Sequence, residues 1–214
     1  MNQNSEKKLS HFRKRLKNKA LSHNEKIEAK RFLEDTPALE IKPSDIRLND
    51  NSKEARNAAK KEAVDRARAN GRQVIATPEA DIVIEPSGIK KSLDHSINQE
   101  KLDALPYIPE VIKKGITVDI SDDFDGKPIR NIHKVLPVKT DSDKDLLMIR
   151  ARQNMGQKPN FYNHIFLKLK GDAKNLPSGV STDDTPANQK ADSKSVAYIK
   201  NILQDILNVK ENEQ

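Results

Sequence analysis

The sequence predicts an α+β protein in which one or more helices pack on a small curved antiparallel sheet, with an N-terminal helical arm and a C-terminal helix. Three strand-like segments, 129–140, 145–153 and 161–170, follow one another through short polar connections, which favours an antiparallel meander. Of the 214 residues, 35% are apolar and 33% are charged. This composition indicates one modest globular core with additional helical segments.

We expect four regions along the chain. They are a basic helical N-terminal region at 1–71, an α+β domain at 72–170, a flexible linker at 171–194 and a C-terminal amphipathic helix at 195–214. The linker is rich in Ser, Asp, Pro, Asn and Lys, a composition that disfavours a packed core. The last helix carries apolar residues at spacings of three and four between 196 and 209, so one of its faces can dock on the sheet or on a partner.

The N-terminal region contains two predicted helices. The first spans 5–35, with a break at 22–24, and the second spans 52–69. Ser52 can cap the start of the second helix, and Gly71 can end it. Residues 37–51, which include two prolines and several Asn, Asp and Ser residues, indicate a linker between the two helices.

The middle of the chain changes from strand to helix. Segments 73–77 and 81–85 read as two short strands or one bent strand, and 89–114 has helical spacing with a break near Pro106 and Pro109. The following run, 119–126, is acidic and lacks the distal Glu of a calcium-binding loop, so it is interpreted as an acidic turn.

Charge and cysteine content restrict the function classes. The net charge is +7, and the basic excess lies in residues 1–71, which suits attraction to nucleic acid or to an anionic membrane surface; a merely solvated lysine-rich helix explains it equally well. The absence of cysteine excludes disulfides and cysteine-ligated zinc. We expect no cofactor and no metal, no membrane span and no cleaved signal peptide. The protein is thus expected in the cytoplasm, or in a target cell after delivery without such a signal.

Alternation along the strands predicts which side chains share a face, because successive side chains point to opposite sides. The helix-covered face is expected to receive Leu147, Ile149, Ala151, Phe161, Ile165, Leu167 and Leu169. The open face is expected to receive Met148, Arg150, Arg152, Tyr162, His164, Lys168 and Lys170. In 129–140 the assignment is ambiguous, since either His133 or its neighbours Ile132 and Lys134 could face outward.

The predicted open face carries the residue types that cleave RNA without a metal. Such cleavage needs a base for the 2′-hydroxyl proton, an acid for the leaving oxygen and cations for the phosphate charge. His164, Tyr162 and Arg150 provide these types, and histidine suits either proton role because its pKa lies near neutrality. A solvated sheet face with Arg–Tyr pairs that only stabilise the strands remains the alternative.

A second cluster lies where a strand gives way to a helix. Residues 88–96 place Lys90, Lys91 and Ser92 beside the free backbone N–H groups of a helix start, with His95 one turn further on. This arrangement is typical of an anion site. It is equally typical of a helix cap with solvated lysines.

The order Asp81-Ile-Val-Ile, Ser87-Gly-Ile-Lys-Lys-Ser, a Leu-rich helical stretch and Phe161-Tyr-Asn-His resembles the barnase/EndoU/colicin/RelE-like (BECR) nuclease domains of phage and conjugative-element polyvalent proteins. The resemblance covers about 74–170. It implies a helix followed by a curved antiparallel sheet, and metal-independent RNase activity. It implicates Lys91, His95, Tyr162 and His164, although this chain has Lys91 where the family pattern has a His and Asn163 where an acidic residue is usual.

We therefore predict a toxin- or effector-type ribonuclease that cleaves RNA by 2′-hydroxyl transesterification. The predicted catalytic residues are His95, His164, Tyr162, Arg150 and Lys91, and the predicted RNA-binding residues are Lys90, Arg152, Lys168, Arg13, Lys14 and Arg15. RNA is the expected partner, with an immunity protein or antitoxin as a further one. The alternatives are a non-catalytic nucleic-acid-binding or structural accessory protein of a mobile element, and a protein-interaction module.

Overall fold

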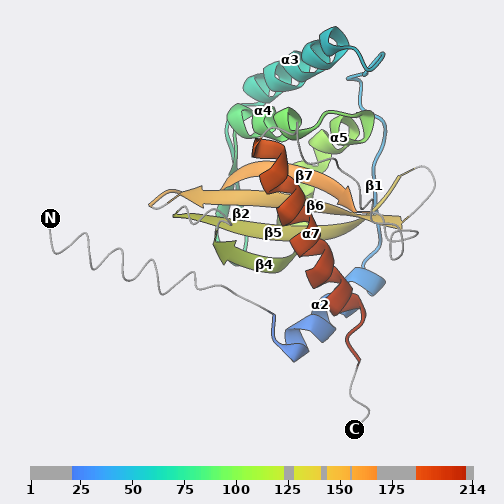
Figure 1. The fold of residues 1–214 in the computed structure, drawn as a ribbon, viewed down its shortest axis with the longest axis vertical. Coiled ribbons are helices and arrows are strands. Elements are labelled where there is room, and N and C mark those ends of the chain that lie inside the picture. Colours follow the sequence, from blue (N-terminus) through green and yellow to red (C-terminus); the bar gives the residue numbers. More distant parts are fainter. Residues whose placement is uncertain (1–20, 123–127, 141–143, 155, 168–186, 211–214) are drawn as a thin grey trace, which may run out of the picture.

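The fold is α+β, as predicted, with a strongly curled mixed sheet (Figure 1). The computed structural model describes residues 21–122, 128–140, 144–154, 156–167 and 187–210, with the backbone alone for 187–195. Within these ranges no helix is both long and apolar enough to cross a bilayer.

Two helices precede most of the sheet. Helix α2, His23–Asp35, begins after Ser22, whose hydroxyl caps the helix in a reciprocal capping box with Glu25. The predicted break at 22–24 is thus a helix start, and the part of the predicted helix before residue 21 lies outside the described residues. Helix α3, Lys53–Asn70, has the predicted Ser52 cap. It ends at Gly71, whose φ of 70° suits glycine.

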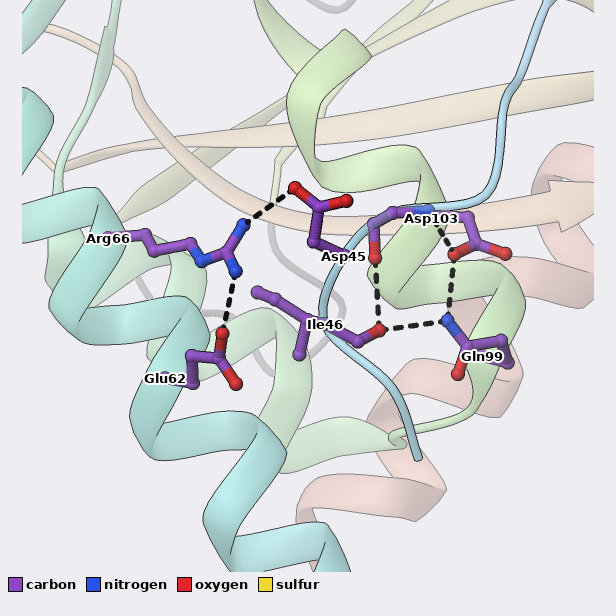
Figure 2. Close-up of polar contacts among 7 residues, drawn as sticks. Asp45, Ile46, Glu62, Arg66, Gln99 and Asp103 are labelled. Carbon is purple, nitrogen blue, oxygen red and sulfur yellow. Dashed lines mark hydrogen bonds and ion pairs between the residues drawn. The ribbon is translucent and has the colours of Figure 1, made fainter. Parts of the chain in front are cut away.

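The segment between α2 and α3 is held against the rest of the molecule. It contains a short strand, β1, Leu39–Glu40, which pairs in parallel with the sheet. Figure 2 shows the contacts that hold the part of this segment after β1. The Ile46 carbonyl accepts a hydrogen bond from Gln99, and Arg66 of α3 lies between Asp45 and Glu62. Ile41 and Ile46 are buried in the main core. This predicted linker is therefore a packed part of the fold.

The remaining strands form one sheet. They are β2, Gln73–Ala76; β3, Asp81–Ile84; β4, Ile116–Asp122; β5, Ile129–Lys139; β6, Lys144–Asn154; and β7, Asn160–Leu167. The order is β1-β5-β6-β7-β3-β2, with β4 also paired to β5. The predicted antiparallel meander of the last three strands is confirmed, while β1–β5 and β3–β7 are parallel pairs and make the sheet mixed.

Short helices fill the chain between β3 and β4. They are α4, Pro86–His95; α5, Gln99–Ala104; the 3₁₀ turn η1, Leu105–Tyr107; and α6, Ile108–Lys114. The predicted break is confirmed, since Pro106 lies in η1 and Pro109 lies in the first turn of α6. Both prolines occupy positions where a missing N–H costs no helical hydrogen bond. The first helix starts at Pro86, three residues before the predicted start.

Apolar residues cover both faces of the sheet. On one face, α3, α4, α5 and α6 form the larger core with Ile132, Ile149 and Phe161. On the other face, α2 and the last helix, α7, Ala187–Leu207, pack on Met148 and Leu167. Figure 1 shows α7 crossing this second face. The face that was expected to be open is therefore partly covered.

Two strand predictions were wrong. Residues 119–122, interpreted as part of an acidic turn, belong to β4. In β7 the pairing shifts between Arg150 and Ala151, so that Ala151 lies opposite Phe161 and Arg150 opposite Asn163. This β-bulge inserts one residue and reverses the alternation beyond it. His164 consequently lies on the helix-covered face, and Ile165 and Leu167 pack on the α7 side.

Candidate active site

Five of the predicted site residues gather around one aromatic ring. The Tyr162 ring lies 4.7 Å from the Arg150 guanidinium carbon, 4.2 Å from that of Arg152 and 5.8 Å from the Lys91 ammonium nitrogen, each measured to the ring centroid. The ring of His95 lies 5.1 Å from it, centroid to centroid. We call these five residues the Tyr162 cluster. They bring three cations, an imidazole and a phenol together.

Three elements position the cluster. Lys91 and His95 are four residues apart on α4 and thus share one helix face. Arg150 and Arg152 are two residues apart on β6 and share one sheet face. Tyr162 sits at the bulge of β7, which lets its ring lie over both arginines. The side chains on one face of β6 and those on one face of α4 therefore come together at this bulge.

The approach of α4 to β7 depends on a glycine. A Cβ atom at Gly88 would overlap the backbone carbonyl oxygen of Phe161. Only glycine permits this contact, because the obstacle is main chain and cannot rotate away. The contact keeps α4 close to β7, so that Lys91 and His95 lie beside Tyr162, the residue that follows Phe161.

Exposure varies strongly within the Tyr162 cluster. Lys91 is exposed, and His95, Arg152 and Tyr162 are half-buried. Arg150 is only 4% exposed. The cluster therefore presents a cationic surface with a second guanidinium beneath it, and cation–π contacts hold the three positive charges near the Tyr162 ring.

A buried polar row continues from Arg150 across the sheet. His133 of β5 lies directly opposite Arg150, and Asp119 of β4 lies opposite His133. His133 Nδ1 and Asp119 Oδ2 are 2.9 Å apart, and the Tyr198 hydroxyl of α7 donates to the other carboxylate oxygen at 3.2 Å. This result resolves the ambiguous strand, since His133 shares the face of Arg150.

The imidazole in this row is neutral near pH 7. Burial lowers the pKa of His133, its hydrogen bond and charge attraction to Asp119 oppose this effect, and the positive charges of Arg150 and Arg152 lower the pKa further. Burial and the Asp119 carboxylate raise the pKa of Tyr198. His133 is 0% exposed, so it lies beside Arg150 on the neighbouring strand without meeting solvent.

His164 belongs to a different group, on the other side of β7. Its Nδ1 lies 2.8 Å from the Ser92 hydroxyl, and its Nε2 lies 3.0 Å from the Lys101 carbonyl oxygen. The Lys101 ammonium donates to the Ser92 carbonyl and to the Asn163 side-chain oxygen, at 2.9 Å each. We call Ser92, Lys101, Asn163 and His164 the buried network. It ties α4 and α5 to β7.

The environment keeps His164 uncharged. Burial, together with the nearby positive charge of Lys101, lowers the pKa of His164 to about 3. Because Nε2 faces a carbonyl oxygen, this nitrogen carries the proton, and Nδ1 accepts from Ser92. The predicted open-face position of His164 is wrong, and the bulge is the reason. Its predicted catalytic role stays a prediction that its 0% exposure does not favour.

The remaining predicted RNA-binding residues are placed as follows. Lys90 is exposed and pairs with Asp94 at 2.9 Å. Lys168, Arg13, Lys14 and Arg15 lie outside the described residues. Neither interpretation of 88–96 as a helix start is correct, because α4 begins at Pro86, after Glu85 and without a side-chain cap. Lys90, Lys91 and Ser92 therefore lie beyond the first turn of α4 and not beside its free N–H groups.

Asp119, Tyr198 and Lys101 were missed as parts of these groups, and Ser92, which was predicted beside an anion site, belongs to the buried network. Asp119 had a signal, because 116–122 alternates apolar and polar residues, as a strand does. No feature of the sequence predicted that Lys101 and Ser92 would be buried, since a lysine and a serine in an amphipathic helix are ordinarily solvated. Tyr198 could not be assigned to this row from the sequence, because it lies on α7, whose packing on the sheet depends on residues distant in sequence.

The comparisons with known proteins concern the region that holds the Tyr162 cluster. No curated protein and no solved structure gives a significant match to the chain. The family model described as large polyvalent protein-associated domain 3 matches residues 48–162, which is more than half of the 214 residues. This segment contains α3, α4, β6 and Tyr162. The chain belongs to the family of large polyvalent protein-associated domain 3.

Proposed function

We propose that the chain is a ribonuclease of toxin or effector type that cleaves RNA without a metal ion, by attack of a 2′-hydroxyl on the neighbouring phosphorus. One observation carries the proposal: a half-buried imidazole and a phenol lie in contact beside three cations in the Tyr162 cluster. These are the group types that this reaction needs, at contact distance from one another.

The reaction divides the proton transfers between two groups. His95 takes the proton from the 2′-hydroxyl, whose oxygen then bonds to phosphorus. The bond from phosphorus to the 5′-oxygen breaks, and the Tyr162 hydroxyl donates a proton to that oxygen. The products are a 2′,3′-cyclic phosphate and a 5′-hydroxyl, and exchange with water restores both side chains.

The cations act on the phosphate. Lys91 and Arg152 are accessible to the non-bridging oxygens, and they offset the extra negative charge of the pentavalent phosphorus. Arg150 adds a third positive charge from below the ring. Hydrogen bonding across the row from Asp119 through His133 keeps this part of the sheet in place, so His133 acts as a positioning residue.

The buried network has a positioning role in the same proposal. His164 and Lys101 connect α4 and α5 to β7, and α4 carries Lys91 and His95. Loss of this network would separate the imidazole from Tyr162 without removing any group of the Tyr162 cluster. This role replaces the direct proton transfer expected for His164 from strand alternation.

The finer family assignment is also a proposal. A helix followed by a curled sheet with the antiparallel β5-β6-β7 meander is consistent with a BECR nuclease domain. The family described as large polyvalent protein-associated domain 3 further suggests a phage or mobile-element setting. An immunity protein or antitoxin would be the partner that such a setting requires.

The test uses a 5′-labelled oligoribonucleotide incubated with the full chain in excess EDTA. We expect cleavage that leaves 2′,3′-cyclic phosphate ends, identified by mass spectrometry, and no cleavage of the matching 2′-O-methyl oligonucleotide. Tyr162→Phe retains the ring that contacts the cations and removes only the hydroxyl, so it is expected to lower the rate without changing RNA affinity.

Two outcomes would contradict the proposal. Cleavage of the 2′-O-methyl oligonucleotide would exclude attack by the 2′-hydroxyl. RNA binding by the wild-type chain without any cleavage would show a nucleic-acid-binding module in place of an enzyme.

A further inference from the structure

A polar hollow is lined in part by His95, whose ring also contacts that of Tyr162. Its volume is about 480 Å³, and it is lined by the first half of α3 and the end of α4. The charged side chains in its lining are Lys53, Arg56, Lys60 and Asp94, and His95 lines it as well. His95 also belongs to the Tyr162 cluster, so the hollow adjoins the cluster at this side chain.

The cations of α3 differ in their partners. Four of them pair with carboxylates: Lys60 with Asp94, Lys61 and Arg68 with Asp65, and Arg66 with Glu62 and Asp45. The Arg66 pairs are visible in Figure 2. The other two, Lys53 and Arg56, have no hydrogen bond or ion pair from their side chains to any residue that the structure describes. Both line the hollow.

The negative charge in the hollow is already neutralised. Asp94 accepts from Lys60 and from Lys90. Although its partial burial would raise the pKa, these lysines hold the pKa of the Asp94 carboxyl below its usual value. Asp94 therefore stays ionised and keeps Lys60 in place, and the positive charges of Lys53 and Arg56 are left for a ligand.

We infer that this hollow binds the phosphate backbone of the RNA strand next to the cleaved phosphate, an inference that rests on the proposed ribonuclease function for the identity of the ligand. Lys53 and Arg56 contact phosphates of the strand after it leaves His95. A single-stranded segment fits the geometry, because the strand must pass from the Tyr162 face around His95 to α3. The hollow contributes affinity for longer RNA and takes no part in bond breaking.

The test compares two double variants with equal charge change on the same helix. Lys53→Ala/Arg56→Ala removes the cations of the hollow, and Lys61→Ala/Arg68→Ala removes two cations outside it. Binding of a fluorescein-labelled 2′-O-methyl decanucleotide to the full chain is measured by anisotropy over a range of KCl concentrations. Removal of the hollow cations is expected to weaken binding about tenfold, and to reduce the salt slope by about 0.7 for each phosphate that is no longer neutralised.

A cleavage readout separates this inference from the proposed function. In the hollow variant, KM for a decaribonucleotide rises and kcat is unchanged, while cleavage of a dinucleotide is unaffected because it does not reach the hollow. Equal decreases of affinity in both double variants, or no RNA binding by the wild-type chain, would overturn the inference. Salt-dependent binding that needs Lys53 and Arg56 in a chain that cleaves nothing would retain the hollow and remove only the ribonuclease proposal.

Discussion

The Tyr162 cluster and the buried network lie on opposite sides of β7 and contain similar residue types, yet their environments differ. Each has a lysine and a histidine, and α4 contributes to both. In the buried network, Lys101 and His164 are almost fully buried, and their polar atoms meet protein partners. In the Tyr162 cluster, Lys91 is exposed and His95 is half-buried. Burial with complete hydrogen bonding suits a structural role, whereas accessible charge suits a ligand.

The two histidines provide the largest expected difference. His95→Ala is expected to lower kcat for RNA cleavage by about 100- to 10,000-fold, because it removes a proton-transfer group, and to leave the melting temperature unchanged. His164→Ala is expected to lower the free energy of unfolding, by about 1–3 kcal/mol for each buried partner left unsatisfied. Cleavage rates and urea unfolding curves of both variants check this prediction. Loss of cleavage in a fully stable His164→Ala protein would mean that both imidazoles take part in the chemistry.

The second-largest expected difference is between the two lysines, Lys101 of the buried network and Lys91 of the Tyr162 cluster. Lys101→Ala leaves the Ser92 carbonyl without the Lys101 donor, at a cost of about 1–3 kcal/mol for this group. It also removes one donor from the Asn163 side-chain oxygen, which keeps its hydrogen bond from the His164 backbone N–H. Lys91→Ala is expected to change stability by less than about 0.5 kcal/mol and to reduce cleavage. Urea unfolding followed by circular dichroism measures both effects. Lys101→Met keeps most of the aliphatic stem as a control, and wild-type stability in that variant would show that the hydrogen bonds contribute nothing.

The pH dependence of stability distinguishes a buried neutral histidine from an accessible one. Folding lowers the pKa of His164 to about 3, while an unfolded histidine has a pKa of about 6.5. The unfolded chain thus binds the proton first, and the free energy of unfolding falls below pH 6.5 by at most about 1.4 kcal/mol per pH unit. The lowered pKa of His133 acts in the same direction.

Urea unfolding between pH 7 and pH 5 measures this slope, in a range where most carboxylates stay ionised. His164→Gln is the matched variant, because it keeps a polar side chain that does not titrate. Its slope is expected to be shallower than that of the wild-type protein. An identical slope would assign the pH dependence to other groups.

Lys90 gives the smallest expected effect, because it is exposed and already paired with Asp94. Lys90→Ala is expected to change the free energy of unfolding by about 0.5 kcal/mol or less. RNA affinity is expected to change less than in Lys91→Ala, since Lys90 is not part of the Tyr162 cluster. Anisotropy titrations with the 2′-O-methyl decanucleotide compare the two variants. An equal decrease of affinity would extend the RNA surface to the side of α4 that carries Lys90.

Much of the Tyr162 cluster could be predicted from periodicity. The spacing of Lys91 and His95 on a helix, and of Arg150 and Arg152 on a strand, depends only on local geometry. The position of His164 could not be predicted, because one inserted residue at the β7 bulge changes the face of every residue that follows it. The buried network also could not be predicted from the sequence, since Lys101 is buried only through partners that are distant in sequence.

The amino-acid sequence alone determined the α+β class, the caps at Ser52 and Gly71, the β5-β6-β7 meander and a cationic patch with Tyr162 in it. These features depend on hydrogen bonds and side-chain periods within a few residues, or on connections too short for another topology. The tertiary structure decided which histidine stands beside Tyr162 and which one is buried. That choice depends on the β7 bulge and on the close contact of Gly88 with Phe161, and both arise only when distant segments pack together.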